Sequence, residues 1–467
     1  MKPYIDREEQ EHKPPLKPVG TFNSDVSPGS HDNFEVEIPS PLSSNQDILE
    51  NISDYVSHLP LSKRNDLVSI FKQFPRVTED VPGYCNHTLH NIELINPEVR
   101  PIKQQPYRLN PERYTAMKEE VDYLIRHGLA EPSNSPWASP CLLVPKPNGA
   151  FRLCTDYRKV NKVTVPDSYP LPLIDVLIDN VGKSEFLTKI DLQKGYYQIG
   201  LTEKAKAISA FITPFGLFQY NVMPFGLCNA PATFQRSINY TIQGLEGVSS
   251  YLDDLLVMST TWDVHLERLS NLFSRLAKAG FTINLEKTTF GCATVTYLGH
   301  VVGQGRTLPT HPNVEAIIDY PTPSTSKSLM RLLGMVGFYR KFCSNFSTVA
   351  APLTDMTSAK RTFRWTSNCE AAFHRLKSLM MSEPVLRTPD YSLPFTLHID
   401  ASSVGVGAAL LQKDSTTDIL HPVFYFSAKL KKHQMAYSTV KKECLSLVLA
   451  LQKFQCYLPQ GAPISLH

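Results

Sequence analysis

The stretch SSYLDDLLVMS, residues 249–259, places two adjacent carboxylates between two apolar runs. Asp253 and Asp254 follow Tyr251-Leu252 and precede the run 255–258, so the pattern predicts two buried strands joined by a turn at the aspartates. Burying an unpaired carboxylate is unfavourable, so two of them at a core turn require a counter-charge. A divalent metal ion would supply that charge, while an ordinary acidic hairpin turn would show the same residues.

The composition is that of a globular protein built from several domains. The chain has 467 residues, of which 42% are apolar and 19% charged, enough for two to four domains with their own cores. No window has the ~18 consecutive apolar residues of a membrane span, and the N-terminus has no apolar signal core. Nine scattered cysteines without a C-x-x-C pair argue against structural zinc and for reduced thiols inside a cell.

Charge is distributed unevenly along the chain. The formal net charge is +3, but residues 1–54 carry 4 Lys or Arg and 11 Asp or Glu, a net of −7, which leaves +10 on the remainder. A basic body suits a polyanionic partner, although the signal is weak because many protein surfaces are mildly basic. The first ~45 residues are also rich in Pro and Ser without periodicity, so we expect a tail or linker there.

Hydrophobic periodicity predicts helices at 111–127 and 263–278, the second with Asp263 as its N-cap and Gly280 as its stop. Residues 141–158 predict a hairpin whose turn is Pro147-Asn148-Gly149.

The texture of the sequence changes after residue 323. Short helices are predicted to 383, then strands from 394 and a long helix in TVKKECLSLVLALQKFQCYL. Because strands and helices alternate without a regular β-α-β rhythm, the predicted fold class is α+β.

A third carboxylate, Asp191, ends the apolar run that opens FLTKIDLQKGYYQIGL, residues 186–201. A lone aspartate at the end of a strand is usually a turn former or a helix cap. If Asp191 meets Asp253 and Asp254 in space, the three could hold two magnesium ions ~3.5–4 Å apart, an arrangement suited to phosphoryl transfer.

Three ordered motifs carry a resemblance to a known family. They are DLQKGYYQI at 191–199, VMPFGLCNAPATFQ at 222–235 and YLDD at 251–254. Their order and spacing resemble the palm of a reverse transcriptase, in particular that of gypsy-like LTR retrotransposons, and similar segments run from about residue 85 to the last residue. The resemblance implies a right-hand polymerase with fingers, palm and thumb, a helical connection and an RNase H-like α/β domain.

The resemblance also implies a division into domains. We expect an acidic, Pro/Ser-rich tail and linker at 1–84, fingers and palm at 85–260, the end of the palm and a thumb-like region at 261–323, a connection at 324–390 and an RNase H-like domain at 391–467. In the family another metal-binding aspartate would shortly follow PISLH, so we expect the RNase H fold to be cut short.

Metal-binding roles can be carried over by motif. The resemblance implies that Asp191, Asp253 and Asp254 bind the catalytic metals, the first two more directly. Asp400, in FTLHIDASS, and Glu443, in STVKKECLSL, resemble the first two metal-binding acids of an RNase H domain. Without this resemblance, Glu443 would be an ordinary exposed residue of a helix.

Nucleotide contacts follow in the same way. Lys146 and Arg152 would neutralise the incoming triphosphate, although such hairpin cations are mostly solvated surface charges in other proteins. Tyr196 would lie beneath the deoxyribose and exclude a 2′-hydroxyl, or else simply pack at a sheet edge. Phe225, before Gly226, would line the nucleotide pocket, where retroviral relatives have Gln, which leaves its exact contact open.

The resemblance therefore implies RNA- and DNA-templated DNA synthesis with two Mg²⁺ per active site, Mn²⁺ as a substitute, and an associated ribonuclease H. The implied partners are a primed RNA or DNA template, dNTPs and other polyprotein products, with no membrane. An intracellular, particle-associated protein of the cytoplasm is implied, with nuclear entry left open. The alternative is a decayed or domesticated fragment that binds nucleic acid without catalysis; the intact palm motifs favour the enzyme.

Overall fold

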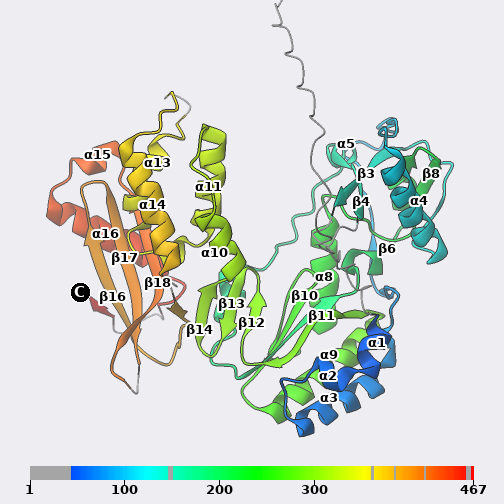
Figure 1. Cartoon of the computed structure of the whole chain (residues 1–467), viewed down its shortest axis with the longest axis horizontal. Helices are drawn as coiled ribbons and strands as arrows, with labels where there is room; N and C mark the ends of the chain where they lie inside the picture. Colours follow the sequence, from blue (N-terminus) through cyan, green and yellow to red (C-terminus); the bar gives the residue numbers. More distant parts are fainter. Residues whose placement is uncertain are drawn as a thin grey trace, which may run out of the picture. The chain divides into compact units, whose positions relative to one another are not determined.

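The computed structural model describes residues 44–145, 151–358, 362–382, 385–414, 417–458 and 464–466 (Figure 1). Within these ranges the strands form five sheets interleaved with helices, which confirms the predicted α+β class. Lys146 and the predicted hairpin turn at 147–149 lie outside the described residues. In the part that is described, no helix is long and apolar enough to cross a membrane.

A five-stranded sheet of order β2-β8-β7-β3-β4 contains the predicted hairpin. Its strands are β2 (Ala130–Pro132), β3 (Ser139–Pro145), β4 (Phe151–Thr155), β7 (Phe211–Thr213) and β8 (Gly216–Tyr220). The helix predicted at 111–127 is α4 (Pro111–Arg126). It begins after Asn110, whose side chain accepts a hydrogen bond from the amide of Arg113. Met117, Val121 and Leu124 are buried on one face of this helix, whereas Tyr114 is exposed.

Several short elements lie before or between the strands of this sheet and of the sheet that carries the aspartates. They are η1 (Pro75–Thr78), α5 (Arg158–Asn161), α6 (Ile174–Asp179), η2 (Gly195–Gln198), α7 (Glu203–Ile208) and the parallel pair β1 (Leu89–His90) and β6 (Gly200–Leu201).

The stretch 249–259 lies in a four-stranded sheet of order β11-β5-β10-β9, here called the palm sheet. Its strands are β5 (Phe186–Leu192), β9 (Val248–Tyr251), β10 (Asp254–Ser259) and β11 (Ile283–Cys292). Leu255 and Val257 join one apolar core, whereas Leu256 and Met258 join another on the opposite face of β10. Burial of both faces explains the unbroken apolar run, and the predicted pair of strands is confirmed.

Helices α8 (Ala230–Ile242) and α9 (Trp262–Ala279) pack against β9 and β10, respectively, in the palm sheet (Figure 1). The predicted helix at 263–278 and its stop are confirmed, because Gly280 takes a left-handed φ of +86°. The predicted N-cap is wrong. Thr261 accepts the hydrogen bond from the amide of Val264, and Asp263 lies in the first turn, where its charge still favours the helix dipole.

Residues 44–78 are folded rather than part of a linker. Helices α1 (Asn45–Glu50), α2 (Ile52–Tyr55) and α3 (Leu61–Gln73) pack near β11 and α9, and Val56 and Leu67 are buried in the main core. The predicted linker at 1–84 is therefore wrong for this part. This segment contains only a few apolar residues among its acidic ones. They are buried by packing against distant elements such as β11, which the local composition does not reveal.

Side chains from these helices cover the free edge of β11, the outermost strand of the palm sheet. Asn45 donates to the carbonyl of Ile283 and accepts from the amide of Leu285, both at 2.8 Å. The hydroxyl of Tyr55 donates to the carbonyls of Leu285 and Thr288. These side chains make the backbone hydrogen bonds that a fifth strand would otherwise make.

A second four-stranded sheet, of order β12-β13-β14-β15, follows the palm. Its strands are β12 (Val295–Tyr297), β13 (His300–Gly303), β14 (Arg306–Pro309) and β15 (Leu386–Arg387). The short helices predicted for 324–383 are confirmed and share a core of their own with the preceding α10. They are α10 (His311–Ile318), α11 (Ser326–Phe338), η3 (Arg340–Phe342), α12 (Phe346–Val349), α13 (Ala351–Asp355) and α14 (Ser367–Met381).

The C-terminal sheet has the order β18-β17-β16-β19. Its strands are β16 (Phe395–Ala401), β17 (Gly405–Lys413), β18 (Leu420–Lys429) and β19 (Ser465–Leu466), and β19 pairs parallel to β16. Of the helices α15 (Lys432–Met435) and α16 (Thr439–Phe454), the second is the predicted long helix and packs on β16 and β17 (Figure 1).

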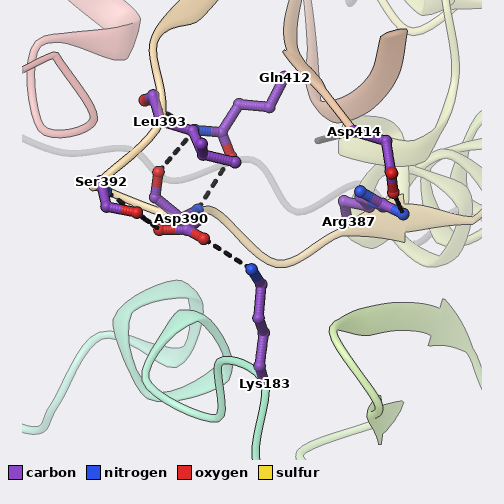
Figure 2. Close-up of polar contacts among 7 residues, drawn as sticks. All are labelled: Lys183, Arg387, Asp390, Ser392, Leu393, Gln412 and Asp414. Carbon is purple, nitrogen blue, oxygen red and sulfur yellow. Dashed lines mark hydrogen bonds and ion pairs between the residues drawn. The ribbon is translucent and has the colours of Figure 1, made fainter. Parts of the chain in front are cut away.

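Three polar contacts join the segment around α6 to elements beyond residue 323. Lys341 Nζ lies 2.6 Å from Asp175 Oδ1, and the Tyr457 hydroxyl donates to Asp179 Oδ2 at 2.9 Å. Lys183 Nζ reaches Asp390 Oδ2 at 2.7 Å, the contact at the centre of Figure 2. One short segment of the palm thus contacts three different parts of the later chain.

The loop that carries Asp390 is held by the buried side chain of Gln412 (Figure 2). Its amide nitrogen donates to the carbonyls of Asp390 at 2.7 Å and Leu393 at 3.2 Å, and its oxygen accepts from the amide of Asp390 at 2.9 Å. Arg387 pairs with Asp414 nearby, at the edge of a cavity of about 660 Å³. The β16–β17 pair thereby fixes the residue that Lys183 contacts.

Candidate active sites

The three palm aspartates lie together at one end of the palm sheet. β5 and β10 run antiparallel with Asp191 and Asp254 as direct partners, and Asp253 stands in the turn just before β10. The amide of Leu192 donates to the carbonyl of Asp253 at 3.2 Å, which ties the turn to the end of β5. The register therefore brings together the carboxylates that the sequence separates by about sixty residues.

The turn between β9 and β10 is held by a buried side chain of α8. Leu252 has a left-handed φ of +54°, unusual for a bulky residue. Its amide donates to Gln235 Oε1 at 2.7 Å, and Gln235 Nε2 in turn donates to Ser250 Oγ at 3.0 Å and Asn239 Oδ1 at 2.9 Å. Gln235 is fully buried, so this network fixes the backbone that carries Asp253.

Gly195 leaves the space that Asp253 occupies. A Cβ at this position would lie 3.1 Å from Asp253 Cβ and 3.1 Å from Phe234 Cζ. Both contacts are tighter than nine in ten real Cβ contacts. A larger residue at 195 would therefore push the aspartate or the ring from its place.

The electrostatics show a site with more buried negative charge than its counter-charges balance. Burial raises the pKa of Asp191 to about 6, Lys287 opposes the rise, and the charges of Asp253 and Asp254 add to it. Burial also raises the pKa of Asp254, opposed mainly by Lys189. Lys189 Nζ lies 3.3 Å from Asp254 Oδ1, and Lys287 Nζ lies 3.7 Å from Asp191 Oδ1.

Sequence reasoning missed both lysines. Lys189 stands two residues before Asp191 on β5, so the two-residue period of a strand could have placed both side chains on one face. Lys287 lies on β11, whose pairing with β5 has a shifted register, and no local pattern places it beside Asp191.

The palm residues fit a divalent cation chemically. Among the described residues, no group of three or more His, Cys, Asp or Glu side chains stands ready to hold a metal. The palm carboxylates instead contact lysines, yet burial still raises the pKa of two of them. Carboxylate oxygens are the ligands that Mg²⁺ prefers, so a divalent cation would supply the missing positive charge.

A cavity of about 790 Å³ opens beside the aspartates, here called the palm cavity. Its lining includes Asp191, Asp253, Arg152 and Phe225. Asp254 and Tyr196 are not among the described residues that line it. The cavity therefore presents acidic and basic side chains to one space.

Of the predicted nucleotide-binding residues that the structure describes, Arg152 and Phe225 line this cavity, and Tyr196 packs against Phe225. The ring of Tyr196 lies 4.9 Å from that of Phe225 and 5.4 Å from that of Phe234. The Arg152 guanidinium lies 5.9 Å from the Phe225 ring. Gly226 has a φ of +99°, and a Cβ there would lie 3.0 Å from the carbonyl oxygen of Thr155, so the site requires glycine.

Comparison with known proteins gives the family. The model described as "Reverse transcriptase (RNA-dependent DNA polymerase)" matches residues 144–302, and that described as "RNase H-like domain found in reverse transcriptase" matches 365–466. The chain is 37% identical over 367 residues to the Retrovirus-related Pol polyprotein from transposon 297 of Drosophila melanogaster. This chain carries the reverse transcriptase and RNase H-like domains of an LTR-retrotransposon Pol polyprotein.

The similarity to the 297 polyprotein covers 77% of this chain and 34% of that protein, so the chain spans about a third of its relative. Solved structures of the foamy viral protease-reverse transcriptase show the same fold. The complex with dsDNA has a TM-score of 0.81 at 24% identity and covers 91% of this chain and 89% of that one. The complex with an RNA/DNA hybrid has a TM-score of 0.76 at 24% identity, covering 92% and 58%.

In the RNase H-like domain the two predicted acids lie on neighbouring elements. Asp400 is near the end of β16 and Glu443 is in the first turns of α16, and both are exposed. Ser446, one turn after Glu443, donates to the carbonyls of Gly407 at 2.9 Å and Asp400 at 3.3 Å. Asn345 donates to Asp400 Oδ2 at 3.3 Å. The helix face that bears Glu443 thus packs where Asp400 stands.

Proposed function

We propose that the reverse transcriptase domain synthesises DNA on RNA and DNA templates by two-metal nucleotidyl transfer. The observation that carries the proposal is the direct pairing of Asp191 with Asp254, with Asp253 beside them and Arg152 lining the same cavity as two of the acids. This combination offers metal-binding oxygens and a phosphate-binding cation to one space.

In this proposal Asp191, Asp253 and Asp254 hold two Mg²⁺ ions, with Mn²⁺ as a substitute. The ions would lower the pKa of the primer 3′-hydroxyl and neutralise charge on the phosphate oxygens. Lys189 and Lys287 favour the ionised form of the buried acids, which metal binding requires. Gln235 positions Asp253 by its hydrogen bond to the turn, and Gly195 does so by leaving room for the Asp253 side chain.

The remaining residues would select and hold the nucleotide. Arg152 would bind the triphosphate together with Lys146, whose position lies outside the described residues. Tyr196 would exclude a 2′-hydroxyl by steric clash, and its packing on Phe225 and Phe234 would keep the ring from turning aside. Gly226 would let the backbone after Phe225 approach the pocket.

For the RNase H-like domain we propose hydrolysis of the RNA strand of an RNA–DNA hybrid. Asp400 and Glu443 would bind its metal ions, and the hydrogen bonds of Ser446 support this by fixing α16 against β16. The proposed partners are primed template, dNTPs and other products of the polyprotein, in cytoplasmic particles with access to the nucleus. The predicted domain boundaries are retained as proposals, except that residues 44–84 join the polymerase.

Primer extension tests the polymerase proposal. Oligo(dT) on poly(rA) should be extended with dTTP when Mg²⁺ or Mn²⁺ is present, and chelation with EDTA should abolish extension. A protein that binds this primer–template tightly without extending it under either metal would instead be the nucleic-acid-binding fragment considered above. That outcome would overturn the enzymatic proposal.

A further inference from the structure

Lys194 holds a backbone conformation that glycine would adopt more easily. It precedes η2 with φ +47° and ψ +44°, in the left-handed region. An L side chain is strained there, and such strain persists at sites where the side chain or the surrounding structure requires it. The next residue, Gly195, must be glycine because a Cβ there would crowd Asp253. The geometry of the turn does not explain in the same way why position 194 is a lysine.

Lys194 lines the palm cavity, together with Arg152, Asp191 and Asp253. Its ammonium lies 3.7 Å from the centroid of the Tyr123 ring on α4. Lys194 forms no ion pair with any described residue, whereas Lys189 and Lys287 each contact a palm aspartate. The ring attracts the ammonium only weakly, so a phosphate anion, which binds a cation more strongly, can displace it.

The charges that line the cavity are mixed, and the charge of Glu120 opposes the burial that lowers the pKa of Lys194. The described lining carries three bases, Arg152, Lys194 and Lys287, and three further acids besides the two aspartates, namely Asp80, Glu120 and Glu286. Lys287 is already engaged by Asp191. Lys194 stands three residues beyond Asp191, so its Cα lies within about 11 Å of the Cα of Asp191.

We propose that Lys194 is a phosphate-binding residue of the nucleotide site, whose ammonium leaves the Tyr123 ring to contact the polyphosphate of an incoming dNTP. The proposal rests on the proposed polymerase function. It explains why the strained position keeps a long cation instead of glycine. It also adds a second cation for the phosphates besides Arg152, placed on a different element, the turn after β5.

Three variants separate this role from a structural one. Lys194→Gly removes the charge and relieves the strain, Lys194→Arg keeps the charge, and Gln304→Gly is the matched control. Gln304 has a φ of +53° in the turn between β13 and β14 and does not line the palm cavity. Both glycine variants should raise the melting temperature.

Only Lys194→Gly should impair nucleotide use. We expect its KM for dTTP on poly(rA)/oligo(dT) to rise about tenfold or more, with kcat changed less than about threefold, since a charge-assisted contact to phosphate is lost. Lys194→Arg should keep the KM within about threefold. An unchanged KM in Lys194→Gly, or an equal rise in Lys194→Arg, would overturn the proposal.

A binding measurement keeps the test independent of catalysis. Calorimetry with magnesium tripolyphosphate should show binding to the wild-type protein and Gln304→Gly that weakens about tenfold in Lys194→Gly. If the wild-type protein extends no primer but this difference is present, the polymerase proposal fails and the phosphate site stands. Equal affinities would remove the phosphate site, whatever the extension assay shows.

Discussion

The palm and the RNase H-like domain bring their proposed metal-binding acids together in different ways. In the palm, strand pairing sets Asp191 directly opposite Asp254, and their side chains are only 18% and 25% exposed. In the RNase H-like domain, a helix packed on a sheet brings the exposed Glu443 near the exposed Asp400. Strand register fixes the relative positions of the palm acids, and burial raises the pKa of Asp191 and Asp254, so their ionised forms depend on nearby positive charge.

The largest expected effect follows from this difference. Asp253→Asn keeps the shape of the palm turn but removes one of the charges that we propose to bind metal, so primer extension should fall at least ~10³-fold. The melting temperature should stay within a few degrees of the wild type. Near-wild-type extension would show that the palm acids are not the catalytic ones.

Matched changes in other parts of the chain sharpen the contrast. Asp400→Asn, in the RNase H-like domain, and Asp122→Asn, exposed on α4, should each reduce extension less than about twofold if extension depends on the palm acids alone. A loss in Asp400→Asn as large as that in Asp253→Asn would mean that the two regions act as one site.

Sugar selection should show a smaller effect within the same region. Tyr196→Val should raise the ratio of ribonucleotide to deoxyribonucleotide incorporation by about tenfold to a hundredfold, because a pocket gains room for one hydroxyl. Single-nucleotide incorporation measures the ratio, with Tyr240→Val on the exposed face of α8 as the control. An unchanged ratio in Tyr196→Val would show that the Tyr196 ring only packs against its neighbours and does not select the sugar.

The third effect concerns pH and metal. The pKa of Asp191 is about 6 in the folded protein and near 3.9 in an unfolded chain. The metal-free protein should therefore lose stability as pH rises from about 4 through 6, since the folded state binds the proton more tightly than the unfolded state.

Magnesium should reverse that loss. It should raise the melting temperature by about 2 °C or more at pH 7.5 and by much less at pH 5, where protons compete for Asp191. Scanning calorimetry with and without Mg²⁺ at both pH values tests this, with Asp191→Asn as the control that should lose the dependence. Equal stabilisation at both pH values would place the bound metal elsewhere.

How much the sequence could reveal differs between local and distant features. The helix α9 was predicted because Leu269, Phe273 and Leu276 repeat at helical spacing, and the turn at Asp253 because apolar runs flank it. The cap at Thr261 was missed because Asp263, two residues later, is an equally good capping residue by type. This error stays within one turn of the helix.

Features that depend on distant pairing could not be predicted in this way. Lys287 reaches Asp191 only through the shifted register of β11 on β5, which no window of sequence contains. The helices at 44–73 bury apolar residues against elements more than 190 residues later, so their own composition reads as a linker. The sequence pattern predicts a helix or strand, but whether its apolar residues are buried depends on the distant element that packs against it.

The smallest expected effects lie around the contact between Lys183, in the segment after α6, and Asp390 in the later chain. Lys183 is 72% exposed, so Lys183→Met should change the free energy of unfolding by less than ~1 kcal/mol. Gln412→Ala should lower it by about 1–3 kcal/mol, because buried backbone groups lose their hydrogen-bond partners. Urea unfolding measures both, and a larger loss for Lys183→Met would show that the ion pair itself holds this junction.

The covered edge of β11 has a consequence for how the chain behaves in solution. An uncovered edge strand offers its free amides and carbonyls to any other extended chain and so promotes aggregation. Asn45 and Tyr55 occupy these groups at Ile283, Leu285 and Thr288. A chain shortened to begin after α2 would keep all three palm aspartates, yet its β11 would be free to pair with another molecule. Its first loss would then be solubility, before any loss of chemistry.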